Sequence, residues 1–118
     1  MGESFKDLVV WQRAVEMTVE IYGFTSSFPP SERFGLTNQL RRASVSVASN
    51  IAEGYGRATR GEYLQFLGHA RGSNCEVETQ LLISGKLEFG RKTSRLSAQG
   101  LCDEVGKMLV AMMKKLQN

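Results

Sequence analysis

The chain has 118 residues, of which 42% are hydrophobic and 23% charged, and its formal net charge is +3 at pH 7. This length supports one core and one domain, and the composition excludes a disordered or disulfide-rich chain. No apolar run reaches the roughly 20 residues that span a bilayer, and no signal region is recognisable, so the sequence predicts a cytoplasmic protein without a membrane partner.

The first predicted helix covers residues 7–26. Its apolar residues recur at spacings of three and four, which is the pattern of one stripe along an amphipathic helix. Pro29 and Pro30 end it, because proline cannot continue a helix and biases the preceding residue toward extended backbone. The stripe consists of Leu8, Trp11, Val15, Val19 and Tyr22.

The second predicted helix covers residues 31–55. Ser31 is a suitable N-cap, although Gly35 can separate the first turn as a short piece. Small residues make this helix slim, so neighbouring helices can approach it on more than one side. Gly54 or Gly56 suits the left-handed position that often follows a helix. The stripe consists of Leu36, Leu40, Ala43, Val47 and Ile51.

The third predicted helix covers residues 60–88. Residues 59–62 match the capping box, in which a threonine and a glutamate side chain bond to each other's backbone N–H groups. Gly68 and Gly72 lie inside the helix, where each costs about 0.8–1 kcal/mol relative to alanine, so we expect another helix to approach closely there. Gly90 is the candidate left-handed residue after the helix. The stripe consists of Tyr63, Phe66, Leu67, Ala70, Val77, Leu81 and residues 83–87.

The fourth predicted helix covers residues 94–117, with Thr93 or Ser94 as its cap. Lys114 and Lys115 fall in its last turn, where cations interact favourably with the helix dipole. Its stripe consists of Leu96, Leu101, Val105, Met108, Leu109, Met112 and Leu116.

Four helices joined by short loops predict an all-α fold, namely an antiparallel up-down-up-down four-helix bundle that forms a single domain over residues 1–118. This topology places the loops around Phe28 and Arg91 at one end. The loop around Tyr55 and both termini then lie at the other end.

Two adjacent arginines, Arg41 and Arg42, lie in the middle of the second helix, so one of them must face an apolar seam. Folding the third helix back onto the second brings Glu76 roughly opposite them. A partly buried Arg42–Glu76 ion pair is the structural hypothesis, because a buried guanidinium needs a carboxylate acceptor. Phosphate binding by both arginines is the functional alternative, and the sequence leaves both open.

No set of residues indicates catalysis, so the sequence predicts a protein that is not an enzyme. Glu53 and Glu62 could form a carboxylate pair, but metal sites in four-helix bundles carry Glu-x-x-His motifs. The single histidine, His69, has no glutamate three residues before it. Cys75 and Cys102 lack metal-ligand spacing, and we expect two buried thiols in a reducing compartment. We therefore predict no catalytic residue, no metal and no cofactor.

The basic residues gather at both expected ends of the bundle. Clusters of Lys and Arg can bind phosphates with a strong dependence on salt, and they can also be an ordinary solvated surface. As nucleic-acid contacts the sequence suggests Arg41, Arg57, Arg60, Lys114 and Lys115.

Several blocks of the sequence resemble a known family. They include ERFGL (residues 32–36), QLRRA (39–43) and NIAEG (50–54), and the likeness continues through ARGS (70–73) and QLL (80–82). Phe5, Leu8 and Trp11 at spacings of three, and later Glu76, fit the same pattern. Together these residues resemble the bacterial four-helix-bundle proteins known as 23S rRNA intervening-sequence proteins.

The resemblance implies an up-down bundle that assembles with its own copies into a ring, a homopentamer, and it implies no catalytic residue. The chain is also similar to the accessory proteins of diversity-generating retroelements, which form basic barrels that bind nucleic acid and a reverse transcriptase. Two functions follow. The chain is a non-enzymatic ring-forming protein that binds RNA or DNA, or it is a scaffold for an unknown protein partner.

Overall fold

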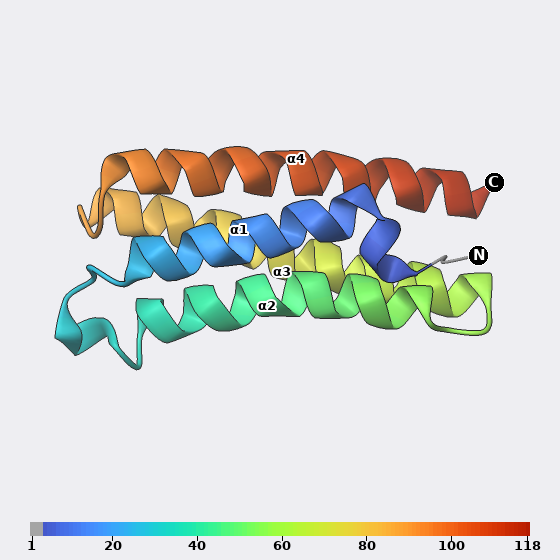
Figure 1. Ribbon diagram of the computed structural model, residues 1–118, viewed down its shortest axis with the longest axis horizontal. Helices are drawn as coiled ribbons and strands as arrows, with labels where there is room; N and C mark the ends of the chain where they lie inside the picture. Colours follow the sequence, from blue (N-terminus) through green and yellow to red (C-terminus); the bar gives the residue numbers. More distant parts are fainter. Residues whose placement is uncertain (1–3) are drawn as a thin grey trace.

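The computed structural model describes residues 4–118, and every regular element in this part of the chain is helical (Figure 1). A short 3₁₀ helix, Phe5–Asp7, precedes the first long helix. Another 3₁₀ helix, Pro30–Glu32, precedes the second long helix. The long helices are α1 (Val9–Thr25), α2 (Leu36–Tyr55), α3 (Arg60–Lys86) and α4 (Lys92–Gln117).

The four long helices confirm the predicted antiparallel bundle. Each helix packs against two neighbours, in the circular order α1, α2, α3, α4 and back to α1. The α1–α2 and α3–α4 connections lie at one end (Figure 1). The α2–α3 connection lies at the other end with Phe5–Asp7 and the last turn of α4, as the topology predicted. None of the helices within residues 4–118 is both long and apolar enough to cross a membrane.

The core takes one buried stripe from each helix. In α2 the predicted residues Leu40, Ala43, Val47 and Ile51 are all buried. In α3 and α4 the middle of each stripe is buried or half-buried, as predicted. Near their shared loop Ile83, Leu87 and Leu96 are 43%, 52% and 51% exposed, whereas Ser84 and Ala98 are buried. Only some of this apolar run can face the core, because successive residues lie about 100° apart around a helix.

Helix α1 departs from the prediction in the face that it buries. The predicted stripe is not the core stripe, and its member Val19 is 65% exposed. Successive residues lie about 100° apart around a helix, so the stripe that begins at Val10 lies on the face next to the stripe that begins at Trp11. Helix α1 is therefore apolar on two adjacent faces. The stripe that enters the core is Val10, Ala14, Met17, Ile21 and Phe24.

The helix ends differ from the prediction in several places. The predicted cap of the fourth helix, Thr93 or Ser94, lies inside α4, which begins at Lys92 after Arg91. The first predicted helix starts at residue 7, but α1 begins only at Val9. The carboxylate of Asp7 instead accepts the backbone N–H of Ser4 at 3.2 Å at the first 3₁₀ helix. Gly35 does separate the first turn of the second predicted helix. Glu32 then accepts the N–H of Leu36 at 3.0 Å, so Ser31 is not the cap of α2.

The other predicted turn signals are confirmed in part. Thr59 caps α3 by accepting the N–H of Glu62 at 3.1 Å, but the carboxylate of Glu62 accepts the Thr59 hydroxyl at 3.1 Å instead of its backbone N–H. Gly90 has the predicted left-handed backbone, with φ of 71°. Gly56, with φ of −82°, does not.

The close approach between helices depends on Gly54 and not on the predicted glycines. A Cβ atom at Gly54 would lie 2.8 Å from the Cβ of Phe66 on α3. A Cβ atom at Gly72 would meet nothing within 4 Å, and one at Gly68 only the Cε of Met113 at 3.9 Å. The expectation for Gly68 and Gly72 is therefore wrong within the single chain, because Gly72 is exposed and Gly68 faces only the end of the Met113 side chain from α4.

This difference predicts opposite effects of the same substitution. Gly54→Ala should lower the free energy of unfolding by about 1–3 kcal/mol, because the methyl group forces α2 and α3 apart. Gly72→Ala should raise it by up to about 1 kcal/mol, because alanine favours the helix and has room. Urea denaturation at one fixed protein concentration measures both. Equal effects of the two substitutions would contradict the packing described here.

Candidate functional site

One outer face of the bundle, between α1 and α2, is almost wholly apolar. It forms a shallow hollow of about 280 Å³, and Val19 and Val45 on its two sides are 65% and 42% exposed. Contiguous apolar surface of this kind on a small protein marks an interaction site more often than isolated exposed residues do. The lining of this α1–α2 face consists of Trp11, Val15, Thr18, Val19, Val45, Ala48, Ser49 and Ala52.

The α1–α2 face combines the second stripe of α1 with the small residues of α2. Ala48 and Ala52 have short side chains, so the hollow is shaped by the α2 backbone between them. Thr18 adds little polarity, because its hydroxyl donates to the carbonyl of Ala14 at 2.9 Å within its own helix. Beyond Val19 the surface continues toward α4 and meets the acidic residues Glu16 and Glu20.

The predicted contact residue Arg41 is held against α1 at the end of this face. Its Nε donates to the hydroxyl of Thr25 at 2.9 Å, and its Nη2 donates to the carbonyl of Tyr22 at 3.4 Å. The guanidinium also lies 4.5 Å from the centre of the Tyr22 ring, which is a cation–π distance. Arg41 therefore links the end of α1 to α2, and part of its donor capacity is already used.

The partners of the predicted ion pair, Arg42 and Glu76, border one groove between α2 and α3. Both side chains are exposed, and within residues 4–118 no Arg42–Glu76 contact occurs within 4.0 Å. The predicted alignment of the third helix along the second is good enough to place Arg42 and Glu76 in the same groove. The partly buried ion pair is not formed, because both side chains are exposed at the surface. The groove also contains Gln80, whose buried Oε1 has no hydrogen-bond partner.

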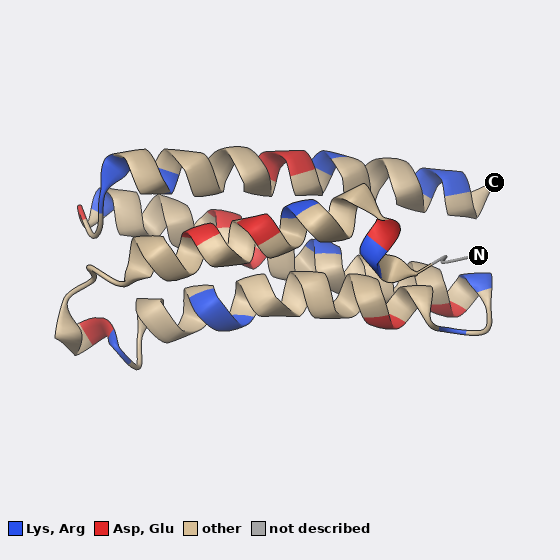
Figure 2. Cartoon of the chain, in the orientation of Figure 1, with Lys and Arg blue, Asp and Glu red and all other residues tan. Residues whose placement is uncertain are grey.

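Four predicted contact residues lie at the end of the bundle that holds the α2–α3 connection (Figure 2). Arg57 forms an ion pair with Glu53 at 3.0 Å and lies 4.5 Å from the centre of the Phe66 ring. Arg60 donates to the carbonyl of Asn118 at 3.2 Å, which joins the start of α3 to the end of α4. Lys114 and Lys115 are exposed in the last turn of α4. The structure thus brings four of the five predicted cations to one end and separates Arg41 from them.

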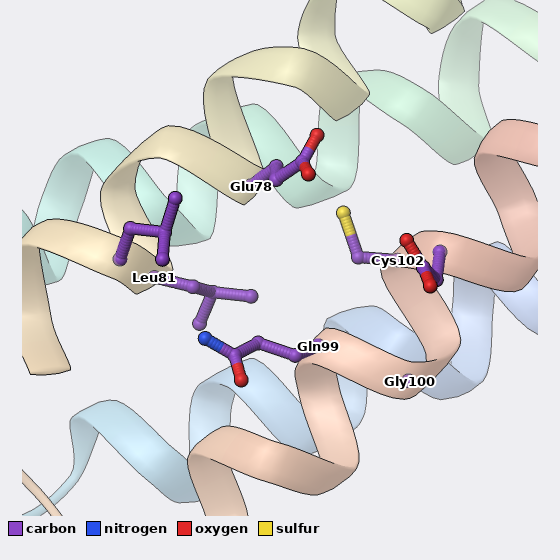
Figure 3. Close-up of a pocket in the computed structure, with 7 residues that line it drawn as sticks. Glu78, Leu81, Gln99, Gly100 and Cys102 are labelled. Atoms are coloured by element: carbon purple, nitrogen blue, oxygen red, sulfur yellow. The ribbon is translucent and has the colours of Figure 1, made fainter.

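A second hollow, of about 280 Å³ between α3 and α4, is where nucleophilic chemistry would be sought (Figure 3). Glu78 and Cys102 line it from the two helices. Burial, assisted by the negative charge of Glu78 and Asp103, raises the pKa of the Cys102 thiol to about 12. The thiol donates to the carbonyl and side-chain oxygens of Asn74 at 3.5 Å. A protonated thiol that is held in this way packs the α3–α4 contact and is a poor nucleophile.

The remaining candidates have local roles. Both cysteines are free, but only Cys102 is buried, so the expectation of two buried thiols is wrong for Cys75, which is exposed on α3. Glu53 pairs with Arg57 and Glu62 with Thr59, and His69 is exposed with the centre of its ring 5.7 Å from the centre of the Phe66 ring. Across residues 4–118, no three His, Cys, Asp or Glu side chains gather as a metal site would require.

The α1–α2 face is the feature that the sequence reasoning missed. Its signal was present, because α1 has a second set of apolar residues at helical spacing, and only one of the two sets can enter a four-helix core. The prediction assigns the set with Trp11 to the core and leaves the set with Val10 without an assignment.

Two comparisons with known proteins give a match. A protein family described as 23S rRNA-intervening sequence protein matches the chain over residues 6–111. Among solved structures, the chain is similar to the crystal structure of a protein of unknown function from the S23 ribosomal protein family of Bacteroides thetaiotaomicron, with a TM-score of 0.80 and 24% identity over 90% of this chain and 99% of that one. At this identity the likeness supports the fold. No curated protein matches.

The two thiols should differ in their reactivity with an alkylating reagent. At about pH 8 the exposed Cys75 should react quickly, whereas Cys102 should stay protonated, since its pKa is raised to about 12, and react only after denaturation. Mass spectrometry of peptides from the alkylated protein measures both rates. The variant Cys75→Ser should have no fast thiol. Equal rates at the two cysteines in the folded protein would contradict this assignment.

Proposed function

We propose that this chain, which belongs to the 23S rRNA-intervening sequence protein family, is a non-enzymatic protein that works by assembling with copies of itself into a closed ring. The observation that carries the proposal is the α1–α2 face, which offers apolar surface on two helices and leaves only Thr18 and Ser49 as polar lining. The sequence resemblance described above implies five copies. The cytoplasm is the proposed location, because free thiols persist in a reducing compartment.

The chemistry of the face favours another copy of the chain as its occupant. Full burial of an exposed valine side chain stabilises by about 1.5–3 kcal/mol. Val19 and Val45 are still 65% and 42% exposed, so covering them recovers a corresponding part of that gain and offsets some of the cost of association. The edge on α1 carries Glu20 and also Glu16, which already pairs with Arg13 at 2.8 Å. The edge on α2 carries Arg41. Copies that meet with the acidic edge of one against the basic edge of the next have complementary charges.

We propose RNA or DNA as the partner of the assembled protein. Cyclic symmetry places the same end of every copy on the same side of a ring. Arg57, Arg60, Lys114 and Lys115 would then be repeated around one rim, and their combined charge would attract phosphates more strongly than the net charge of one chain suggests. Arg41 is left out of this group because it faces α1. A scaffold that binds only proteins is the alternative, and it predicts no retention of nucleic acid.

A charge placed in the α1–α2 face should break the assembly. We expect Val19→Glu to reduce the particle to the mass of one chain, because burial of an unpaired carboxylate is strongly unfavourable. Thr79→Glu is the matched control, since it adds the same charge at an exposed site on α3, and it should keep the wild-type mass. Size exclusion with light scattering measures the mass, and circular dichroism checks the fold. A single-chain mass for the wild type, or an intact ring for Val19→Glu, would refute the proposal.

Removal of charge from the rim should weaken nucleic-acid binding and its dependence on salt. We expect the double variant Lys114→Gln, Lys115→Gln to bind labelled RNA and DNA less tightly. The slope of log affinity against log salt should become shallower by at least about 1.4, which corresponds to the loss of two phosphate contacts on a single strand. Arg91→Gln with Lys92→Gln removes the same charge at the other end and should change little.

Fluorescence anisotropy between about 50 and 200 mM salt makes this measurement. If the wild type binds neither RNA nor DNA at the lowest salt, nucleic-acid binding is wrong and the scaffold function remains. If the Lys114/Lys115 pair and the Arg91/Lys92 pair of substitutions weaken binding equally, only the total charge of the protein matters for binding. The rim is then not the binding site.

A further inference from the structure

We infer that the groove between α2 and α3 binds one nucleotide of a single-stranded nucleic acid, with a phosphate at Arg42 and the edge of a guanine base at Glu76 and Gln80. This inference rests on the nucleic-acid binding proposed above and gives it a site that can read a base. The groove lies between α2 and α3, and its residues Asn38, Arg42 and Ser46 also border the hollow beside Tyr22 and Val45.

The α2–α3 groove has the size and lining of a polar binding site. Its volume of about 470 Å³ lies within the range of about 300–1,000 Å³ that is usual for small-molecule sites. One charge of each sign lies among its polar side chains, and its single apolar residue is small. The lining consists of Asn38, Gln39, Arg42, Ala43, Ser46, Glu76 and Gln80.

The polar groups of the groove divide into those that are satisfied and those that are not. Ser46 and Ser73 join α2 to α3 through a hydrogen bond of 2.9 Å between their hydroxyls, and Asn50 donates to Ser46 at 3.0 Å. By contrast, the Oε1 atom of Gln80 is buried without a donor. Buried polar atoms nearly always have a partner, and no hydrogen bond holds this oxygen in place. Rotation of the half-buried Gln80 side chain into the groove would therefore break no hydrogen bond of Oε1 and would present it to a ligand that donates to it.

Arg42 and Glu76 give the groove two charges that nothing else uses. No acidic side chain within residues 4–118 lies within 4.0 Å of the Arg42 guanidinium, and the Glu76 carboxylate has no cation within that distance. A guanidinium offers two parallel N–H donors that match a phosphate. A carboxylate is an acceptor only, with room for two donors. The groove therefore fits a ligand that has an anionic group at one side and adjacent N–H donors at the other.

A guanine nucleotide has this arrangement of groups. The Watson–Crick edge of guanine presents two adjacent N–H donors, at N1 and N2, which the carboxylate of Glu76 can accept together. The second N2–H points toward the sugar edge and can donate to the Oε1 atom of Gln80. Uracil presents a single N–H between two carbonyl oxygens, and those oxygens would face acceptors. The Watson–Crick edge is free only where the base is unpaired, so the ligand is a single strand rather than a duplex.

The test measures the binding of fluorescent single strands by anisotropy at low salt, using a strand of alternating guanine and uracil and a strand of uracil alone with equal length. The wild type should bind the guanine strand about tenfold more tightly, which is a typical discrimination for two hydrogen bonds to one base. Glu76→Gln should remove this preference and leave the affinity for the uracil strand unchanged. Glu78→Gln, which changes the same charge on the other side of α3, should keep the preference.

Arg42→Gln completes the test, because loss of a phosphate contact should lower the affinity for both strands by a similar factor. A guanine preference that survives in Glu76→Gln overturns the inference, as does a wild type that binds both strands equally. In either case, rim-dependent binding would leave the proposed function standing. A wild type that binds neither these single strands nor a duplex overturns both this inference and the proposed nucleic-acid binding, and leaves the scaffold function. If Arg42→Gln or Glu76→Gln lowers the mass of the particle, the groove is a contact between copies, which also overturns the inference.

Discussion

The structure depends on one constraint, which is that α1 is apolar on two adjacent faces and a four-helix bundle can bury only one of them. The stripe of Val10, Met17 and Ile21 enters the core. The stripe of Trp11, Val15 and Val19 is left between α1 and α2 at the surface. Because that surface is flanked by the slim part of α2, it forms a hollow rather than a ridge. The proposed assembly follows from this excess of apolar surface more than from any single contact.

Helix α2 separates three kinds of environment around its circumference. Leu40, Val47 and Ile51 face the core, and Gly54 lets α3 approach closely enough to close it. The second side adjoins α1 and is apolar, whereas the third adjoins α3 and is polar. The adjacent arginines show the consequence of this division. Arg41 bonds to α1, but Arg42, about 100° further around the helix, lies in a groove with Glu76.

The sequence predicted the number of helices, their order and most of the core, because proline, capping residues and helical spacing are local signals. It could not decide which stripe of α1 is buried, since Trp11 and Val10 begin stripes of similar spacing and only the packing of the other helices selects one. It brought Arg42 and Glu76 to the same groove but could not determine their exposure, which depends on side-chain direction. Gly72 shows the same limit, because a glycine in a helix indicates a close contact only if a neighbour lies there.

Trp11 is the single tryptophan of the chain and lies in the wall of the α1–α2 face, so its fluorescence reports directly on the central claim. The decisive measurement is the quenching of this fluorescence by acrylamide in the wild-type protein over a dilution series. If copies of the chain cover this face, Trp11 is shielded at high protein concentration and becomes accessible as the particle dissociates. Partial quenching that is the same at every concentration, in a particle with the mass of one chain, would contradict the account.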